Sequence, residues 1–444
     1  MPRPTSKATP RSFNGFSGWR VELPGGRPVA TPAVADGLVF VGGGYGSHEF
    51  YAFDAASGEL AWQIHTKDDG PTAAVAIGGL VAFNTESCTL YVVEAATGRI
   101  VWERWLGDPL MAQPAVDAQH VYMAYPVREG GHRLGHRLAC FMLHSGDPVW
   151  SAPIGHDIIT APIRHGDSLY VSTYDGRVHR FDAGTGKCLW VKDYRATSAP
   201  WVSGDRVLVS MRREGEDAPV EEVHAYHSGT GRRSGRKAYS SEKAAYLRSK
   251  RSSSEAARLD ALDSSVGFAS APSAAKLHEV ESLVGEYRVA GSWRYQGSRP
   301  VVSDDRCFLI VGDDLRCNSV SSEETIWHKI AGNEGAPSRR LVPPALANGK
   351  LFVTMLEGTV ACLDQATGKD LWSCQVGENL EWSPAVQGGR IYLGTSGGGL
   401  VCVDTGDPAN TGWPMWGGGP GHNGPSPAPA TGATAVLSGT TLAH

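Results

Sequence analysis

The sequence predicts an all-β fold, an eight-bladed β-propeller built from four-stranded antiparallel blades. Three observations lead to this fold class: a short apolar opening recurs eight times, a Gly and a Trp recur four residues apart, and alternating apolar and polar runs lie between them. Each repeat supplies about four short strands in ~40 residues. Four-stranded meanders repeated around an axis form a propeller.

Each repeat opens on a short apolar segment that reads Pro-Ala-Val or a variant. An alternating run follows, as in Ser168-Leu-Tyr-Val-Ser172, and its period of two is typical of a half-buried strand. Asp175-Gly176 and Glu357-Gly358 are expected hairpin turns, which favours antiparallel meanders over parallel βα units. The eight openings are Pro32, Ala74, Pro114, Pro162, Pro200, Pro300, Pro344 and Pro384.

Each repeat ends on a turn motif that leads into the fourth strand. In Asp182-Ala-Gly-Thr185-Gly186-Lys-Cys-Leu-Trp190, the Asp and the Thr can bond local backbone amides, and the Gly supplies a positive φ. The Trp four residues later is expected to fill the space between neighbouring blades. The Gly residues that match this spacing are Gly58, Gly98, Gly146, Gly186 and Gly368. The expected ladder of structural Trp residues is Trp19, Trp62, Trp102, Trp150, Trp190, Trp293, Trp327 and Trp372.

Two members of this ladder depart from the regular spacing. Trp293 is assigned to the fifth blade because it lies seven residues before Pro300, and Trp327 follows a unit in which Glu323 replaces the Gly. The blade that opens at Pro384 is expected to take its outer strand from Trp19 to Leu23, so that the N-terminal strand closes the ring and removes two open sheet edges. Trp413 is the rival for that outer position.

The repeats divide the chain into a flexible N-terminal segment (1–16), the propeller (17–424) and a disordered tail (425–444) that is rich in Pro, Ala, Ser and Thr. An insertion at 232–292 interrupts the fifth blade and is expected to be partly helical, over 254–262 and 274–283. Its first part is strongly basic. It is either a solvated loop or a docking site for an acidic partner. The candidate partner-binding residues are Arg232, Arg233, Arg236, Lys237, Lys243, Arg248, Lys250 and Arg251.

Charge and hydropathy limit the classes of partner. The formal net charge is −5, so no overall field favours nucleic acid. No apolar run is long enough for a membrane span or a secretory signal, so the chain as written is expected in the cytoplasm, or exported if the true start lies upstream. Eight separate Cys residues without zinc-ligand spacing suit reduced, buried strand positions. A monomeric propeller with a protein partner is expected.

The unit from Asp182 to Trp190, repeated from Asp364 to Trp372, resembles the tryptophan-docking motif of the pyrroloquinoline-quinone-repeat (PQQ-like) β-propeller family. The resemblance covers about residues 18–416. Trp413-Pro-Met-Trp-Gly-Gly-Gly-Pro-Gly-His-Asn-Gly424 is similar to a short element that flanks these propellers, which implies a cap at one end of the ring. The family implies two functions: a non-catalytic scaffold, as in outer-membrane-assembly propellers, or a quinone-dependent alcohol or sugar dehydrogenase.

The sequence favours the scaffold, because no reaction centre is apparent. No catalytic, cofactor-binding or metal-binding residue is predicted, and pyrroloquinoline quinone with calcium enters only under the dehydrogenase alternative. His132 and His136 could share a metal ion only on a helix, which their Gly neighbours oppose. The acids recur at the turn position of several repeats, which favours turn stabilisation over general acid or base catalysis.

Overall fold

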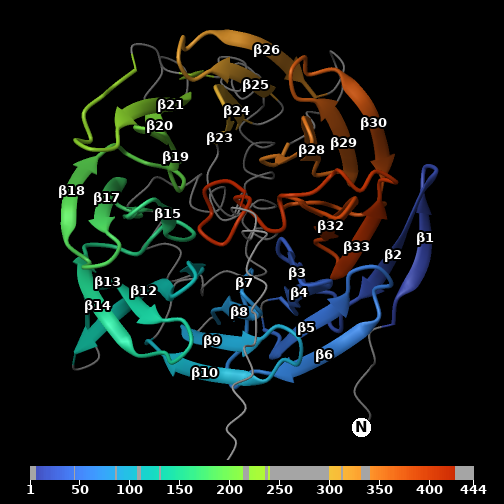
Figure 1. The fold of residues 1–444 in the computed structure, drawn as a ribbon, viewed down its shortest axis with the longest axis horizontal. Coiled ribbons are helices and arrows are strands. Elements are labelled where there is room, and N and C mark those ends of the chain that lie inside the picture. The colour runs from blue at the N-terminus through green and yellow to red at the C-terminus, as the bar shows by residue number, and fades with distance from the viewer. Residues whose placement is uncertain are drawn as a thin grey trace, which may run out of the picture.

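The chain forms a ring of eight radial β-sheets, as a computed structural model shows (Figure 1). The structure describes residues 7–44, 46–85, 88–107, 112–129, 132–213, 220–235, 239–240, 300–311, 314–331 and 341–425. The described residues contain no helix, and therefore none that is long and apolar enough to cross a membrane. The predicted eight-bladed, all-β fold is confirmed.

The first four blades are antiparallel meanders in chain order, with the first strand nearest the axis. Blade one holds β3 (Ala33–Ala35), β4 (Leu38–Gly42), β5 (Glu49–Asp54) and β6 (Leu60–His65), and blade two holds β7 (Val75–Ile77), β8 (Leu80–Phe83), β9 (Thr89–Glu94) and β10 (Ile100–Trp105). Blade three holds β11 (Ala115–Val116), β12 (His120–Glu129), β13 (His132–Met142) and β14 (Pro148–Ile154), and blade four holds β15 (Ile163–His165), β16 (Ser168–Ser172), β17 (Arg177–Asp182) and β18 (Cys188–Asp193).

The last four blades follow the same order, except that the final one borrows strands from the other end of the chain. Blade five holds β19 (Trp201–Ser203), β20 (Arg206–Arg213), β21 (Val220–His227) and β22 (Tyr239–Ser240), and blade six holds β23 (Pro300–Ser303), β24 (Arg306–Val311), β25 (Asp314–Ser319) and β26 (Thr325–Ile330). Blade seven holds β27 (Ala345–Ala347), β28 (Lys350–Thr354), β29 (Thr359–Asp364) and β30 (Asp370–Gln375), and blade eight holds β31 (Ala385–Gln387), β32 (Arg390–Gly394), β33 (Gly399–Asp404), β2 (Phe16–Glu22) and β1 (Thr9–Phe13).

Within blade four, burial is greatest in the second strand and least in the outermost one. In blade four every residue of β16 is buried, whereas the outermost strand β18 is exposed except for the half-buried Trp190. Neighbouring blades cover both faces of the second strand, so its polar ends Ser168 and Ser172 are buried together with its apolar residues. The core therefore lies between blades, and the position of each outer Trp decides how two blades meet.

The N-terminal strand closes the ring, as predicted. β2 pairs antiparallel with β33 and places Trp19 opposite Cys402 and Gly18 opposite Val403. A fifth strand then extends this blade, because β1 pairs with β2 through a tight turn at Asn14-Gly15. β1 lies within the segment 1–16, which the sequence prediction placed outside the sheet. Its residues are mostly exposed, so no apolar pattern marks the strand in the sequence.

Blade five departs from the sequence prediction at its outer edge. The fourth position, assigned from the sequence to Trp293, is occupied by β22, which pairs with β21 in the register Val223 to Tyr239. The turn at His227–Gly231 leads directly into this segment, so the fourth strand precedes most of the insertion. Trp293 and both expected helices lie outside the described residues.

Candidate functional site

The contact between blades one and two shows how most blades meet. The Trp62 ring lies on Gly98 of the next blade, so closely that a Cβ at Gly98 would be 2.6 Å from the ring. Its indole N–H donates to the Ala95 carbonyl at 2.8 Å. Gly98 has φ +70°, a conformation that L side chains rarely adopt. The turn Gly thus meets two demands, a positive φ and a close approach by the ring.

Five further interfaces repeat this geometry. In each, the Trp of one blade contacts the turn Gly of the next, and its indole N–H donates to the carbonyl three residues before that Gly. Gly231 belongs to this set although the sequence assignment left it out, because His227 replaces the Asp that opens the turn motif. The pairs are Trp19 with Gly58, Trp102 with Gly146, Trp150 with Gly186, Trp190 with Gly231, and Trp327 with Gly368.

The interface between blades seven and eight is a variant of this contact. Trp372 meets Phe16 of the closing strand, with ring centroids 4.6 Å apart and planes tilted by 45°. An aromatic pair in a tilted arrangement is favourable beyond its buried area. The ring closure therefore substitutes a second aromatic ring for the turn Gly.

Among the residues that the structure describes, no Trp–Gly pair joins blades five and six. Gly235 occupies the place of the Trp, four residues after Gly231, and its amide donates to the Ala225 carbonyl. Glu323 occupies the place of the Gly and has φ +61°. A Cβ at Gly235 would lie 2.5 Å from the Glu323 carboxylate. The small residue therefore lies on blade five and the larger side chain on blade six, the reverse of the regular interfaces.

Arg206 makes the hydrogen bond that a Trp indole makes elsewhere. Its guanidinium donates to the carbonyl of Val320, which lies three residues before Glu323. This is the repeat position that accepts the indole N–H at the six regular interfaces. The polar contact is therefore retained between blades five and six, while the repeat position of the Trp holds Gly235, which has no ring to pack.

Two of the predicted partner-binding residues lie beside this irregular interface. Arg232 and Arg233 are exposed on the turn that precedes Gly235, and Arg233 forms an isolated bridge with Tyr226. Arg236, Lys237, Lys243, Arg248, Lys250 and Arg251 lie outside the described residues. The described basic surface thus begins where the regular packing stops.

Residues 413–424 form a plug at the centre of the ring, seen as the red loop in Figure 1. The plug bonds to the innermost strands of several blades. Trp413 exchanges backbone hydrogen bonds with Val386 of β31, and the carbonyl of Pro414 accepts the amide of Val34 of β3. We call this end of the ring the plugged mouth.

The plug is anchored in blade three by a fully buried His. His422 stacks on Trp416 with centroids 3.6 Å apart, its Nε2 lies 2.9 Å from the Pro114 carbonyl, and its Nδ1 lies 3.2 Å from the Trp416 carbonyl. Burial lowers the pKa of His422 to about 4, although both carbonyls favour the protonated form. The plug is therefore held by a neutral imidazole.

Asn423 ends the plug on blade five by imitating a strand residue. Its Oδ1 accepts the amide of Val202 and its Nδ2 donates to the Val202 carbonyl, both at 2.7 Å. Nδ2 also lies 3.1 Å from Nδ1 of His165. Burial, together with neighbouring Arg164, lowers the pKa of His165, which suits an unprotonated Nδ1 as the acceptor.

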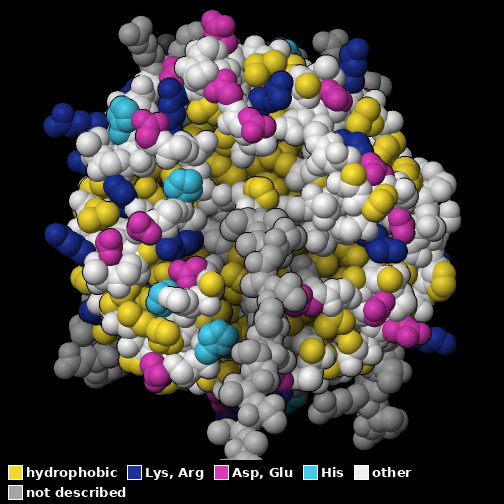
Figure 2. Space-filling model, viewed as in Figure 1, with side chains coloured by type: hydrophobic (Ala, Val, Ile, Leu, Met, Phe, Trp, Pro, Cys, Tyr) yellow, Lys and Arg dark blue, Asp and Glu magenta, His cyan; other side chains and the backbone are white. Residues whose placement is uncertain are grey.

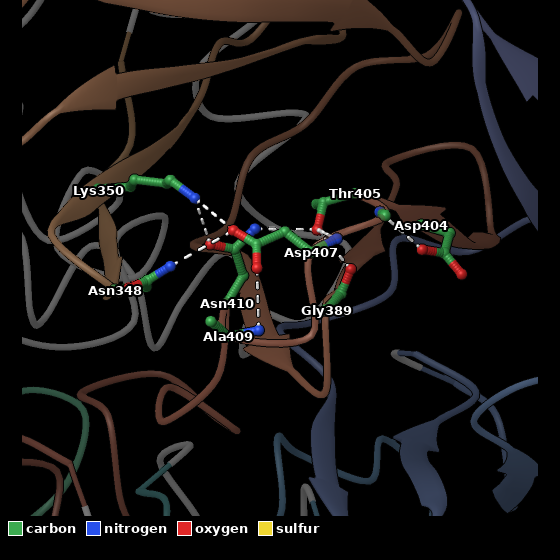
Figure 3. Close-up of polar contacts among 9 residues, drawn as sticks. Asn348, Lys350, Gly389, Asp404, Thr405, Asp407, Ala409 and Asn410 are labelled. Carbon is green, nitrogen blue, oxygen red and sulfur yellow. Dashed lines mark hydrogen bonds and ion pairs between the residues drawn. The ribbon is translucent and has the colours of Figure 1, made fainter.

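An ion pair fastens the segment that enters the plug to blade seven (Figure 3). Lys350 donates to the Asp407 carboxylate at 2.6 Å and to Oδ1 of Asn410 at 2.9 Å, and Asn348 also reaches Asp407. The hydrogen bond from Lys350 and the amide of Ala409 lower the pKa of Asp407. This network fixes the chain immediately before Trp413.

A cavity of about 760 Å³ lies at the plugged mouth, beside blades five, six and seven. The face drawn in Figure 2 is hollowed near its centre on this side, with hydrophobic side chains in the hollow. Trp201 and Trp413 stack in parallel at 6.1 Å in its wall, and Arg306 and Asp364 add charge. Trp201 is thus a buried residue at the plug, although it lies outside the predicted Trp ladder.

The circumference of the ring exposes apolar side chains at one repeated position. The residue before the interface Trp is exposed in four blades, because the pleat turns it outward when the Trp turns inward. These residues are Val149, Leu189, Ile326 and Leu371. Val191 adds to the surface of β18, and Trp105 at the end of β10 is 69% exposed.

The described residues show no cluster of side chains that could hold a metal ion. All eight Cys are free and spread over the blades, seven of them buried and Cys188 exposed. Within the described ranges no group of three or more His, Cys, Asp or Glu side chains is placed to hold a metal ion. His132 and His136 lie on one strand, β13, rather than on a helix, so the spacing that would let them share a metal is absent.

The repeated acids serve the turns. Oδ1 of Asp182 accepts both the amide and the hydroxyl of Thr185, and these bonds lower the pKa of Asp182. Asp364 has the same contacts with Thr367 and a lowered pKa for the same reason. Both carboxylates are ionised turn supports and lack the raised pKa of a general acid.

Comparison with known proteins agrees with this architecture. The family model described as outer membrane protein assembly factor BamB matches residues 14–237, 134–337 and 311–440. The BamB of Burkholderia pseudomallei is 23% identical over 259 residues, which cover 47% of this chain and 65% of that protein. The chain spans less than two thirds of the length of the curated relatives it matches.

Solved structures and a shorter match extend the comparison. The crystal structure of BamB from Moraxella catarrhalis superimposes with a TM-score of 0.55 at 16% identity, over 90% of this chain and 98% of that one. The lanthanide-dependent methanol dehydrogenase of Methylacidiphilum fumariolicum is 41% identical over 59 residues, which cover 12% of this chain and 10% of the dehydrogenase.

Proposed function

Because the chain belongs to the family of outer membrane protein assembly factor BamB, we propose that it is a non-catalytic scaffold that binds other proteins. The observation that carries the proposal is the repeated exposure of large apolar side chains on the outermost strands. Val149, Leu189, Ile326 and Leu371 hold one repeat position, and each lies on a strand whose outer backbone edge faces solvent. Such edges are sites where another protein can add a strand.

Blade four offers the longest stretch of such surface. Leu189 and Val191 lie two residues apart on β18, so they point to the same side of the strand. Main-chain hydrogen bonds from β18 would supply affinity, and these two side chains would supply selectivity. The partner is expected to present an extended apolar segment.

The basic residues at the irregular interface form a second proposed contact. Arg232 and Arg233 are exposed beside Gly235, and the further basic residues of the insertion follow in the sequence. Clustered Arg side chains bind carboxylates through paired hydrogen bonds, so this contact would take an acidic segment of a partner. Deleting residues 236–290 tests it, because loss of the co-purifying partner is expected and its complete retention would remove this role.

The scaffold proposal is tested by placing one Lys at the repeated outer position of each blade. The variants are Val149→Lys, Leu189→Lys, Ile326→Lys and Leu371→Lys, and Ala61→Lys is the matched control at the same position of blade one. A charge on an edge strand opposes strand addition. Affinity purification from the source cells followed by size-exclusion chromatography should show one variant that loses the partner at an unchanged unfolding midpoint. Identical partner profiles in all five variants would reject the proposal.

A quinone-dependent dehydrogenase is the second candidate, favoured by the 59-residue match to the methanol dehydrogenase. Reconstitution with pyrroloquinoline quinone and calcium, followed by absorbance spectra and dye reduction with alcohols and aldoses, separates the two functions. The scaffold proposal expects no quinone absorbance after gel filtration. Tight quinone binding with turnover would overturn it.

A further inference from the structure

One repeat position on the innermost strands binds the plug. This position is the second-last residue of seven inner strands and the last residue, Val116, of β11. Its amide points toward the axis because the inner strand is the edge of its sheet. Five of the eight amides donate to the plug at 2.7–2.9 Å. The pairs are Val386 with Trp413, Val34 with Pro414, Val116 with Pro420, Arg164 with Gly421, and Val202 with the side chain of Asn423.

The plug meets the blades in the order of the ring. Its residues 413, 414, 420, 421 and 423 contact blades eight, one, three, four and five, so the chain winds around the mouth in one direction. It passes blade two without a bond to Ala76, the corresponding amide. After Asn423 the next blades in this direction are six and seven.

The corresponding amides of blades six and seven belong to Val302 and Leu346. Between residues that the structure describes, neither amide has a hydrogen bond to the plug. Both residues line the cavity at the plugged mouth, and Pro425, the last described residue, lines it as well. The chain therefore enters the cavity at the point where two inner-strand edges still face the axis.

A buried side chain in the same cavity also lacks an acceptor. Trp413 is 1% exposed, and its indole N–H has no hydrogen-bond partner in the described part of the chain. A buried donor without an acceptor is unfavourable, so such groups are normally paired. The cavity therefore offers donors from Val302 and Leu346, with a third on the Trp413 ring in its wall.

We propose that residues 426–444 continue around the mouth and bind in this cavity as an extended segment, with carbonyl oxygens facing Val302 and Leu346. Carbonyls of Pro and Gly are the groups the plug already uses on Val34, Val116 and Arg164. The continuation begins Ser426-Pro-Ala-Pro-Ala430, which favours an extended backbone with small side chains.

The spacing and the covalent link support this occupant. Between Pro420 and Asn423, successive plug contacts on neighbouring blades lie one or two residues apart in the chain. At this spacing, the residues directly after Pro425 can reach blades six and seven. A segment tethered at the cavity has an effective concentration in the millimolar range, above that of a free competitor. This inference rests on the plugged mouth alone and is independent of the scaffold proposal.

Amide hydrogen exchange tests the proposal. The full chain is compared with a chain that ends at Pro425, and exchange is read by mass spectrometry or NMR at Val302 and Leu346. Exchange at these two amides should be about tenfold faster in the shortened chain, because a hydrogen bond has been lost. Val34 and Val116 are internal controls, whose exchange should not change because their acceptors remain.

A synthetic peptide of residues 426–444, added to the shortened chain, should restore slow exchange at Val302 and Leu346, and a scrambled peptide should not. Equal exchange in the two chains, with no effect of the peptide, would overturn the proposal. Protection of the shortened chain that rises with its concentration would assign the cavity to a second copy. Protection seen in both chains only when a partner protein is present would assign it to that partner.

Discussion

The two sides of blade five are built differently. Toward blade four, Trp190 lies on Gly231 and donates to the Ser228 carbonyl at 2.8 Å. Toward blade six, Gly235 faces Glu323, and Arg206 supplies the hydrogen bond that the indole would make. Equivalent repeat positions form both interfaces. Comparing them therefore shows which contacts depend on the Trp–Gly pair. Within the described ranges, the irregular interface thus keeps the hydrogen bond but not the packing of a Trp ring on a Gly.

The plug follows the same division. It bonds to inner strands from blade eight round to blade five and ends there, just before the irregular interface. Blades five to seven thus share one weakened interface and one cavity at the mouth, whereas the arc from blade eight to blade five is tied at both its inner edge and its interfaces. We expect opening of the ring to begin between blades five and six.

The largest expected effect is the loss of a regular interface ring. Trp62→Ala should lower the free energy of unfolding by about 3–5 kcal/mol, because a buried ring and its hydrogen bond to Ala95 disappear. Urea unfolding followed by fluorescence measures the change. Trp105→Ala is the control, since this Trp is 69% exposed and should cost less than about 0.5 kcal/mol. Similar costs for the two variants would contradict the role of the interface ring.

Acid should loosen the plug on the regular arc. In the unfolded chain His422 takes up a proton near its usual pKa of 6.5, whereas in the folded chain its pKa is about 4. The unfolded state therefore binds more protons between these values, and the free energy of unfolding falls as the pH falls from 6.5 to 4, by up to about 3 kcal/mol. Unfolding measured across this range should show the slope, and His422→Asn should flatten it. An unchanged slope in the variant would assign the pH dependence to other groups.

Adding a Cβ to a regular turn separates backbone strain from the clash with the ring. Gly98→Ala should lower the free energy of unfolding by about 1–3 kcal/mol, because the new methyl meets Trp62 at a positive φ. Gly78→Ala is the matched control, with φ +57° and no atom within 4 Å of the added Cβ. The thermal unfolding midpoint of Gly98→Ala should lie well below that of the control. Equal midpoints would mean that only the backbone conformation matters.

The smallest expected effect comes from restoring the missing pair. Gly235→Trp alone should destabilise the protein, because the ring meets the Glu323 carboxylate, and Glu323→Gly alone should change stability little. In a double-mutant cycle, the double variant should be more stable than the sum of the two single effects predicts, by about 0.5–3 kcal/mol in the free energy of unfolding. Strict additivity would show that the two blades are held in a geometry that no Trp–Gly pair can fit.

The ring could be predicted from the sequence because the turn Gly and the interface Trp each serve one structural role and recur at a fixed spacing. The Trp spacing assigns Trp19 to the last blade, since Trp19 lies 13 residues before Pro32 and the regular units lie 12 residues before their openings. The same logic failed in blade five. His227 replaces the turn Asp and Gly235 replaces the Trp, so the repeat looks interrupted from Gly231 on. The spacing then points to Trp293, which lies outside the described residues, and does not indicate β22.

The plug and its cavity could be predicted only in outline. Resemblance implied a cap near Trp413, but its place depends on amides from five blades that are far apart in the chain. The exposed strand β1 carries no apolar period, and the burial of Trp201 follows from stacking on Trp413 rather than from its own repeat. Contacts of this kind join residues that no local pattern links.

The closing pair of β2 and β33 joins strands that are synthesised at very different times. Gly18 and Val403 lie opposite each other, yet the ribosome makes them roughly 20–80 s apart at ordinary elongation rates. During that interval Trp19 and Val21 have left the ribosome without the strand that will cover them. The hairpin of β1 and β2 is therefore made well before the strand that completes its blade.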